Sequence, residues 1–120
     1  MEITPIKDCK TGARNLNLFF IVLEVSQRPT TTKEGIKTRT CKVADRTACI
    51  DLSVWGELES YIQPGDICRL TKGYVSVHKG KPTLYVGKGG ELMKTGEFCL
   101  IFNESVNMSD PTVNQIVTLE

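Results

Sequence analysis

At 120 residues, with 40% hydrophobic and 24% charged residues, the chain has the size and composition of one soluble globular domain. No apolar run approaches the length of a membrane span, so we expect a soluble, intracellular protein without a membrane partner. The net charge of +1 hides an uneven distribution: residues 1–96 carry 15 Lys and Arg against 10 Asp and Glu, whereas residues 97–120 carry none against 4. A basic body of this kind can bind phosphates although the whole chain is nearly neutral.

Metal-binding and catalytic patterns are missing from the sequence. The five cysteines lie at scattered spacings without a C-x-x-C pair, and His78 is the only histidine, so neither a metal site nor a cofactor is expected. A Ser/His or Cys/His pair would have to use His78, which lies among lysines. Residues 87–90, GKGG, are too short for a phosphate-binding loop and lack the helix that should follow it. The sequence therefore predicts that the protein is not an enzyme. The cysteines are expected to be reduced and mostly buried, with a redox role or intermolecular disulfides as the alternative.

The first part of the chain predicts strands separated by turns. Residues 1–15 are an irregular lead-in with at most one helical turn. Residues 16–25, LNLFFIVLEV, are apolar and rich in β-branched and aromatic side chains, which favours a strand buried on both faces or curled between two halves of a barrel. Turn-forming residues fill 26–35, and a second strand is expected at 37–44.

The clearest alternation lies in residues 48–55, ACIDLSVW, and predicts a third strand. Its apolar face consists of Ala48, Ile50, Leu52 and Val54, and its other face of Cys49, Asp51, Ser53 and Trp55. Tryptophan buries a large area and is normally inside a protein, so Trp55 on the polar face indicates a binding surface. The alternative is a strand end tucked under the next segment.

A short helix and a basic hairpin follow. Residues 57–62, ELESYI, predict one or two helical turns, which Pro64 and Gly65 end. Residues 70–90 predict two strands joined by a basic turn. Val75, Val77, Leu84 and Val86 fall on the buried side of this hairpin, and Tyr74, Ser76, His78, Thr83 and Tyr85 face out. Flat rings beside cations suit a single-stranded nucleic acid, because bases stack and phosphates need neutralising. The alternative is that the rings only decorate a solvated hairpin.

The order of these elements, β-β-β-α-β-β, predicts an all-β OB-fold: a five-stranded Greek-key barrel with a short helix between strands three and four. The ligand face of that fold lies on the second and third strands and the loops beside them. The OB domain is expected over residues 1–102, where the apolar run 98–102 packs along the barrel. Residues 103–120 are acidic and aperiodic, and are expected to form a poorly ordered tail.

The candidate binding residues are the outward rings and the basic side chains around them. The candidate stacking residues are Trp55, Tyr74, His78 and Tyr85. The candidate phosphate contacts are Lys33, Arg39, Lys42, Lys72, Lys79, Lys81 and Lys88. Each stacked base contributes about 1–3 kcal/mol and tolerates most sequences. The alternatives are that His78 is an ordinary exposed histidine and that each cation is only a solvated charge.

Four segments of the chain also resemble a known family. They are NLNLFFIVLEV, RTCKVADRTACIDLSVW, YIQPGDICRLTKGYVSV and TLYVGKGGELMKTGEFC. In this order they resemble the B subunits of the SOSS complex, the small, single-OB eukaryotic single-stranded DNA-binding proteins, from about residue 7 to 102. The resemblance implies work in the nucleus in the DNA-damage response, coating single strands near double-strand breaks. It also implies two partners, a large helical scaffold subunit and a small third subunit.

The resemblance assigns roles to particular positions. Trp55, Tyr74 and Tyr85 match the DNA-stacking aromatics of the family. His78 departs from it, because the family generally has phenylalanine there, and a histidine stacks more weakly and with a pH-dependent charge. Glu97 and Phe98 lie in the segment that the resemblance associates with docking of the scaffold. The longer Gly/Pro-rich tail of the family is not seen.

The leading hypothesis is a single-stranded DNA-binding protein with little sequence preference. The alternative from another class is an OB-fold adaptor for proteins that uses residues 98–102 as its contact. RNA is a third possibility, because nothing in the sequence identifies a reader of the 2′-hydroxyl.

Overall fold

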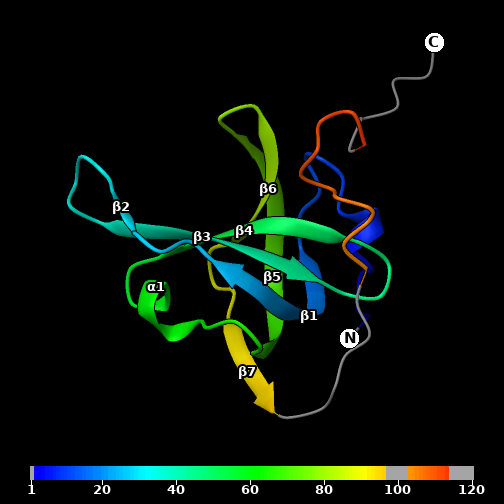
Figure 1. Ribbon diagram of the computed structural model, residues 1–120, viewed down its shortest axis with the longest axis horizontal. Coiled ribbons are helices and arrows are strands. Elements are labelled where there is room, and N and C mark those ends of the chain that lie inside the picture. The colour runs from blue at the N-terminus through cyan, green and yellow to red at the C-terminus, as the bar shows by residue number, and fades with distance from the viewer. Residues whose placement is uncertain (1, 97–102, 114–120) are drawn as a thin grey trace.

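A closed ring of strands forms the body of the protein in the computed structural model, which describes residues 2–96 and 103–113 (Figure 1). The elements are η1 (Ile6–Asp8, a 3₁₀ helix), β1 (Leu16–Val25), β2 (Thr30–Thr31), β3 (Lys37–Ala44), β4 (Cys49–Trp55), α1 (Leu58–Tyr61), β5 (Ile67–His78), β6 (Lys81–Val86) and β7 (Leu92–Gly96). The ring runs β1-β3-β4-β6-β5 and closes because β5 pairs with β1. The pairs are antiparallel except β4 with β6, and α1 lies between β4 and β5 in the chain. This is the predicted OB-fold arrangement.

β1 closes the barrel because it is long enough to pair on both edges. Its second half pairs with β3 and its first half with β5, with register shifts at Leu16/Leu18 and Val22/Glu24. Alternate residues from Leu16 to Val22 are buried in the core, and those between them are half-buried. Such irregularities let a strand curl between two parts of a barrel, so the strand predicted from residues 16–25 is confirmed.

The core is filled by the alternating apolar residues of the five ring strands. Its largest fully buried side chains include Phe20, Leu18, Ile50, Leu52, Leu70 and Leu84. Four cysteines, Cys9, Cys41, Cys49 and Cys68, are buried as free thiols, and Cys99 lies outside the described residues. Burial raises the pKa of the Cys9 and Cys68 thiols to about 12 and that of Cys41 to about 11. These groups therefore stay protonated and pack as small hydrophobic side chains.

The N-terminal lead-in packs across one part of the barrel. Ile6, in η1, is fully buried, and its backbone N–H donates to Asp45 Oδ2 at 2.9 Å. The N–H of Gly12 donates to the Val75 carbonyl at 3.0 Å, and the N–H of Val75 donates back to the Ala13 carbonyl. The sequence predicts one helical turn here but not the burial of Ile6.

Residues 103–113, which we call the C-terminal strap, fold back against the start of β4 (Figure 1, orange). The Cys49 N–H donates to the Val106 carbonyl at 2.8 Å, and the Met108 N–H donates to the Cys49 carbonyl at 2.7 Å. Met108 is buried in the core. The sequence pattern did not indicate these contacts, because backbone pairing and one inserted side chain need no periodicity; that residues 103–120 form a poorly ordered tail stays a prediction. The domain boundary at residue 102 stays a prediction, and the apolar run 98–102 lies outside the described residues.

Two residues of the β5–β6 hairpin differ from the prediction. Val77 was expected on the buried side with Val75 but is 54% exposed, because residues 76–81 extend beyond the barrel and are all exposed in the described structure. Thr83 was expected to face solvent but is only 3% exposed. The strap covers it: Ser109 Oγ donates to the Pro82 carbonyl at 2.7 Å.

No helix within residues 2–96 and 103–113 is long and apolar enough to span a membrane.

Candidate nucleic-acid interface

The outward face of β3, β4, β6 and β5 places the predicted aromatic residues next to one another. Thr40, Ser53, Tyr85 and Tyr74 are direct cross-strand partners and form one row across the four strands. Trp55 lies two residues after Ser53 on β4, at the end of the strand. Directly opposed side chains in a sheet are about 4.5–5.5 Å apart at Cβ, so the row is a continuous surface.

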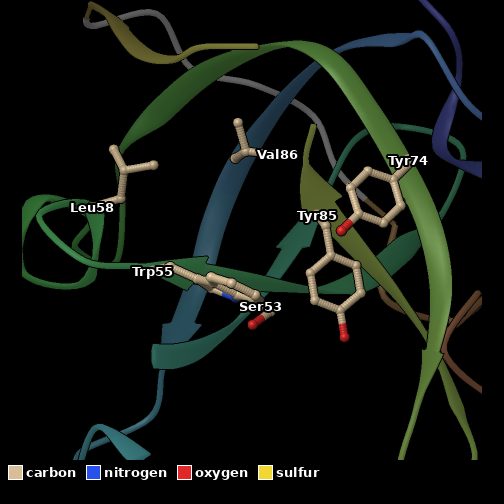
Figure 2. Close-up of a pocket in the computed structure, with 6 residues that line it drawn as sticks. All are labelled: Ser53, Trp55, Leu58, Tyr74, Tyr85 and Val86. Carbon is tan, nitrogen blue, oxygen red and sulfur yellow. The ribbon is translucent and has the colours of Figure 1, made fainter. Parts of the chain in front are cut away.

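The three rings line one pocket of about 250 Å³, together with Ser53, Leu58 and Val86 (Figure 2). The rings of Tyr74 and Tyr85 stack with centroids 5.2 Å apart and an interplanar angle of 17°. Trp55 is 51% exposed, so this strand end is not tucked under the following segment. The arrangement places the exposed Trp55 ring beside a stacked and half-exposed pair of tyrosine rings.

A second pocket of about 220 Å³ continues the first toward the hairpins. It is lined by Thr30, Thr32, Thr38, Thr40, Ser53, Trp55, His78, Lys79 and Tyr85. Ser53, Trp55 and Tyr85 line both pockets, so the two form one channel, which we call the aromatic groove. The β2–β3 and β5–β6 hairpins, which extend beyond the barrel in Figure 1, supply its far end. β2 lies in the stretch predicted only as a turn.

Among the candidate cations, Lys79 lines the groove beside His78. Lys33 is exposed in the turn between β2 and β3. Lys81 pairs with His78 across the hairpin and lines a separate pocket with Asp51. Lys79 and Lys33 lie on the two hairpins that supply this end of the groove, which suits contacts to a backbone that enters or leaves it.

Lys72 and Lys88 lie at the other end, beyond Tyr74. A side chain at Gly87 would lie 3.5 Å from the Tyr74 ring and 2.2 Å from the Lys72 carbonyl oxygen, so only glycine fits between these two residues. The Lys72 side chain passes Gly89, and both lysines are exposed. Positive charge is therefore present at both ends of the groove.

Two candidate cations are not at the groove. Arg39 alternates with Thr38 and Thr40 and faces the other way: Nη1 donates to the Ser26 carbonyl at 2.8 Å, and Nη2 pairs with Glu59 Oε2 at 3.3 Å. Lys42 lies on the outward face, but its ammonium pairs with Glu104 of the strap at 3.1 Å. The hydrogen bond to Glu104 is the main cause that raises the pKa of Lys42. Both cations already have protein partners.

Burial changes the pKa of two side chains on this face of the sheet. It raises the pKa of Tyr85, and the neighbouring Tyr74 adds to this. Burial also raises the pKa of Asp51, one row away, while Lys81 and Lys42 act against it. Within the two described ranges, no group of three or more Asp, Glu, His or Cys side chains is placed to hold a metal ion.

The structure adds residues to the site that the sequence did not single out. They are Ser53, Leu58, Val86 and the threonines of β2 and β3, Thr30, Thr32, Thr38 and Thr40. Ser53 was placed on the correct face by alternation, and this was the only signal for it. Glu97 and Phe98, the predicted contacts of a protein partner, lie outside the described residues.

Comparisons with known proteins agree with this architecture. No family model matches the chain. Among curated proteins, the chain is 24% identical over 112 residues to the single-stranded DNA binding protein Ssb of Saccharolobus solfataricus, an alignment that covers 92% of this chain and 76% of the relative. Among solved structures it is similar to a hypothetical protein of Arabidopsis thaliana, F20O9.120, with a TM-score of 0.75, 21% identity and coverage of 92% and 84%.

Two archaeal structures are also similar. The OB domain of Ta0387 from Thermoplasma acidophilum has a TM-score of 0.68 and 16% identity, covering 82% of this chain and 92% of that domain. A replication factor A related protein from Methanobacterium thermoautotrophicum has a TM-score of 0.61 and 18% identity, covering 78% and 91%. The protein thus has the OB fold, as predicted. Its sequence is also similar to that of a single-stranded DNA binding protein, which agrees with the prediction of a non-enzymatic protein.

Proposed function

We propose that this protein binds single-stranded DNA in the aromatic groove, by stacking bases on Trp55, Tyr85 and Tyr74. The observation that carries the proposal is that three rings line one open pocket while the only tryptophan of the chain stays 51% exposed. A large ring that is kept out of the core loses the stabilisation that burial would give it, and a stacked base would restore that contact. The name of the Saccharolobus relative supports the same ligand.

Lysines at both ends of the groove supply the electrostatic part of the proposed binding. Lys79 and Lys33 lie at the hairpin end, and Lys72 and Lys88 lie beyond Tyr74. Phosphate contacts release counterions, so each contact to a single strand adds about −0.7 to the slope of log affinity against log salt concentration. Stacking tolerates any base, which accounts for little sequence preference.

The test is a fluorescence-anisotropy titration of labelled oligothymidine, oligouridine and duplex DNA at two salt concentrations. We expect tight binding of oligothymidine, weakened by salt, and much weaker binding of the duplex, whose paired bases cannot enter the groove. Equal or tighter binding of oligouridine would make RNA the ligand. No binding of any single strand by the folded protein would leave the adaptor function as the better account.

We further propose that the protein is the DNA-binding subunit of a SOSS-like complex of the nuclear DNA-damage response, joined to a large helical scaffold subunit and a small third subunit. This rests on the resemblance of the four sequence segments. Tagged full-length protein should recover a large helical protein from nuclear extract, identified by mass spectrometry. The same recovery with Phe98→Ala as with the natural sequence would contradict a scaffold contact at Glu97 and Phe98, whereas Trp55→Ala should leave recovery intact.

A further inference from the structure

We propose that the hydroxyl of Ser53 contacts the edge of the base held at Trp55 and Tyr85, and so adds a hydrogen bond to an interface otherwise made by stacking. This inference rests on the proposed function, since it names a further contact in the same groove. Stacking on the aromatic rings alone would give Ser53 no part in binding.

The first step is the position of Ser53. On β4 it is paired with Thr40 on one side and Tyr85 on the other, and it precedes Trp55 by two residues on the same face. It lines both pockets that form the aromatic groove. Figure 2 shows the short side chain between the Trp55 indole and the Tyr85 ring. A base stacked on either ring would therefore turn one of its edges toward Ser53.

The second step is the unused hydrogen-bonding capacity of this hydroxyl. In the described part of the chain, the Ser53 hydroxyl has no hydrogen-bond partner. Two other hydroxyls nearby have protein partners: Thr38 donates to the Thr30 carbonyl, and Ser109 donates to the Pro82 carbonyl. Ser53 is half-buried beside the apolar side chains of Leu58 and Val86, which line the same pocket. A polar group in that position gains from a ligand that supplies a partner.

The third step is the chemistry that fits. A hydroxyl offers one donor and two acceptor lone pairs and rotates to suit its partner, so it can meet a carbonyl, a ring nitrogen or an exocyclic amine. Leu58 and Val86 make the neighbouring wall apolar, which excludes water and strengthens a hydrogen bond formed there. One such bond corresponds to about a 2- to 10-fold gain in affinity. The contact favours any natural base over a flat ring without polar edges, and therefore keeps sequence preference low.

The experiment compares oligothymidine with an oligonucleotide of the same length in which every base is 2,4-difluorotoluene, which has the shape of thymine without its hydrogen-bonding edge. The dissociation constants of both are measured for the natural protein, Ser53→Ala, Ser53→Thr and Ser76→Ala. Ser76 is the matched control, since it is exposed on the same face of the sheet but lines neither pocket. Thermal unfolding of each variant checks that the barrel is intact.

We expect the preference for thymine over the isostere to fall about 2- to 10-fold in Ser53→Ala, and to keep its natural value in Ser53→Thr and Ser76→Ala. The same preference in Ser53→Ala as in the natural protein would overturn the inference. Failure of the natural protein to bind oligothymidine would instead overturn the proposed function, so the two failures are distinguishable.

Discussion

Both ends of β4 place polar or amphipathic side chains on the outward face, but one end faces an open groove and the other faces the C-terminal strap. Toward its end, Ser53 and Trp55 face an open groove, and Trp55 is 51% exposed. Toward its start, Asp51 faces the C-terminal strap, and Thr83, the partner of Asp51 on β6, is 3% exposed. Side chains alternate between the two faces in both halves of the strand. The exposure of the outward residues therefore depends on whether another segment covers that half.

In the covered half, backbone polar groups are paired through the strap, whereas the open half leaves a side-chain hydroxyl unpaired among the described residues. Ser109 of the strap accepts from the Asp51 N–H and donates to the Pro82 carbonyl, each at 2.7 Å. In the open half, the Ser53 hydroxyl has no partner among the described residues. Groups that a fold leaves unused on an accessible surface are the ones available to a ligand. Changes in the strap should therefore alter stability without altering DNA binding, and changes in the groove should do the reverse.

The largest effect is expected at the strap. Met108→Ala removes a fully buried side chain from the core and should lower the free energy of unfolding by about 2–5 kcal/mol. Urea unfolding measures this loss. In buffer, where the variant remains folded, its affinity for oligothymidine should match that of the natural protein. A large loss of affinity in a folded variant would show that the strap takes part in binding.

The next largest effect is expected from a substitution in the aromatic groove. Trp55→Ala should weaken binding of single-stranded DNA by about 1–3 kcal/mol, because a stacking platform is lost. Its free energy of unfolding should change little, since the ring is half exposed. The control is Tyr61→Ala, which removes an exposed ring of α1 that lies under the Lys94 ammonium and outside the groove. Equal losses of affinity in both variants would indicate a general surface effect instead of stacking.

A smaller change in stability is expected from Ser109→Ala. It leaves the Asp51 N–H and the Pro82 carbonyl without their partner, which costs about 1–3 kcal/mol of unfolding free energy. Ser105→Ala, an exposed serine of the same strap, serves as the control and should be neutral. The prediction is wrong if the two variants unfold at the same urea concentration.

The smallest effect concerns pH. Burial raises the pKa of Asp51, so its contribution to stability is full below the ordinary aspartate pKa of about 3.9 and is lost as pH rises through the folded-state value. Asp51→Asn should therefore stabilise the protein at neutral pH, by less than about 1 kcal/mol because solvent and nearby lysines screen the charge. The gain should disappear toward pH 3. A variant less stable than the natural protein at pH 7 would contradict this.

Sequence patterns were sufficient to assign side chains to the inner or outer face where one face of a strand is buried along its length. Alternation in residues 48–55 placed Ile50, Leu52 and Val54 inside and Ser53 and Trp55 outside, as observed. The element order then identified the OB fold. The grouping of Trp55, Tyr74 and Tyr85 followed from the same alternation, because the fold brings β4, β5 and β6 side by side.

Alternation was insufficient to predict the contacts of a residue whose partner lies in a distant segment of the chain. Ile6 and Met108 lie in short segments without strand alternation, and only the closed barrel gives them a place to be buried. Arg39 was counted among the phosphate contacts, yet its phase in β3 is opposite to that of Thr38 and Thr40, and it pairs with Glu59 of α1. Lys42 was assigned the correct face, but Glu104 of the strap binds it there. No local pattern encodes these partners.

The most direct test of the account is a titration of tryptophan fluorescence with short oligothymidine. Trp55 is the only tryptophan, so the signal reports the groove alone. We predict strong quenching by the single strand, weakened by salt and nearly absent with duplex DNA of the same length. Unchanged fluorescence at low salt, with binding shown by anisotropy on the same sample, would place the DNA elsewhere on the protein and contradict stacking on Trp55.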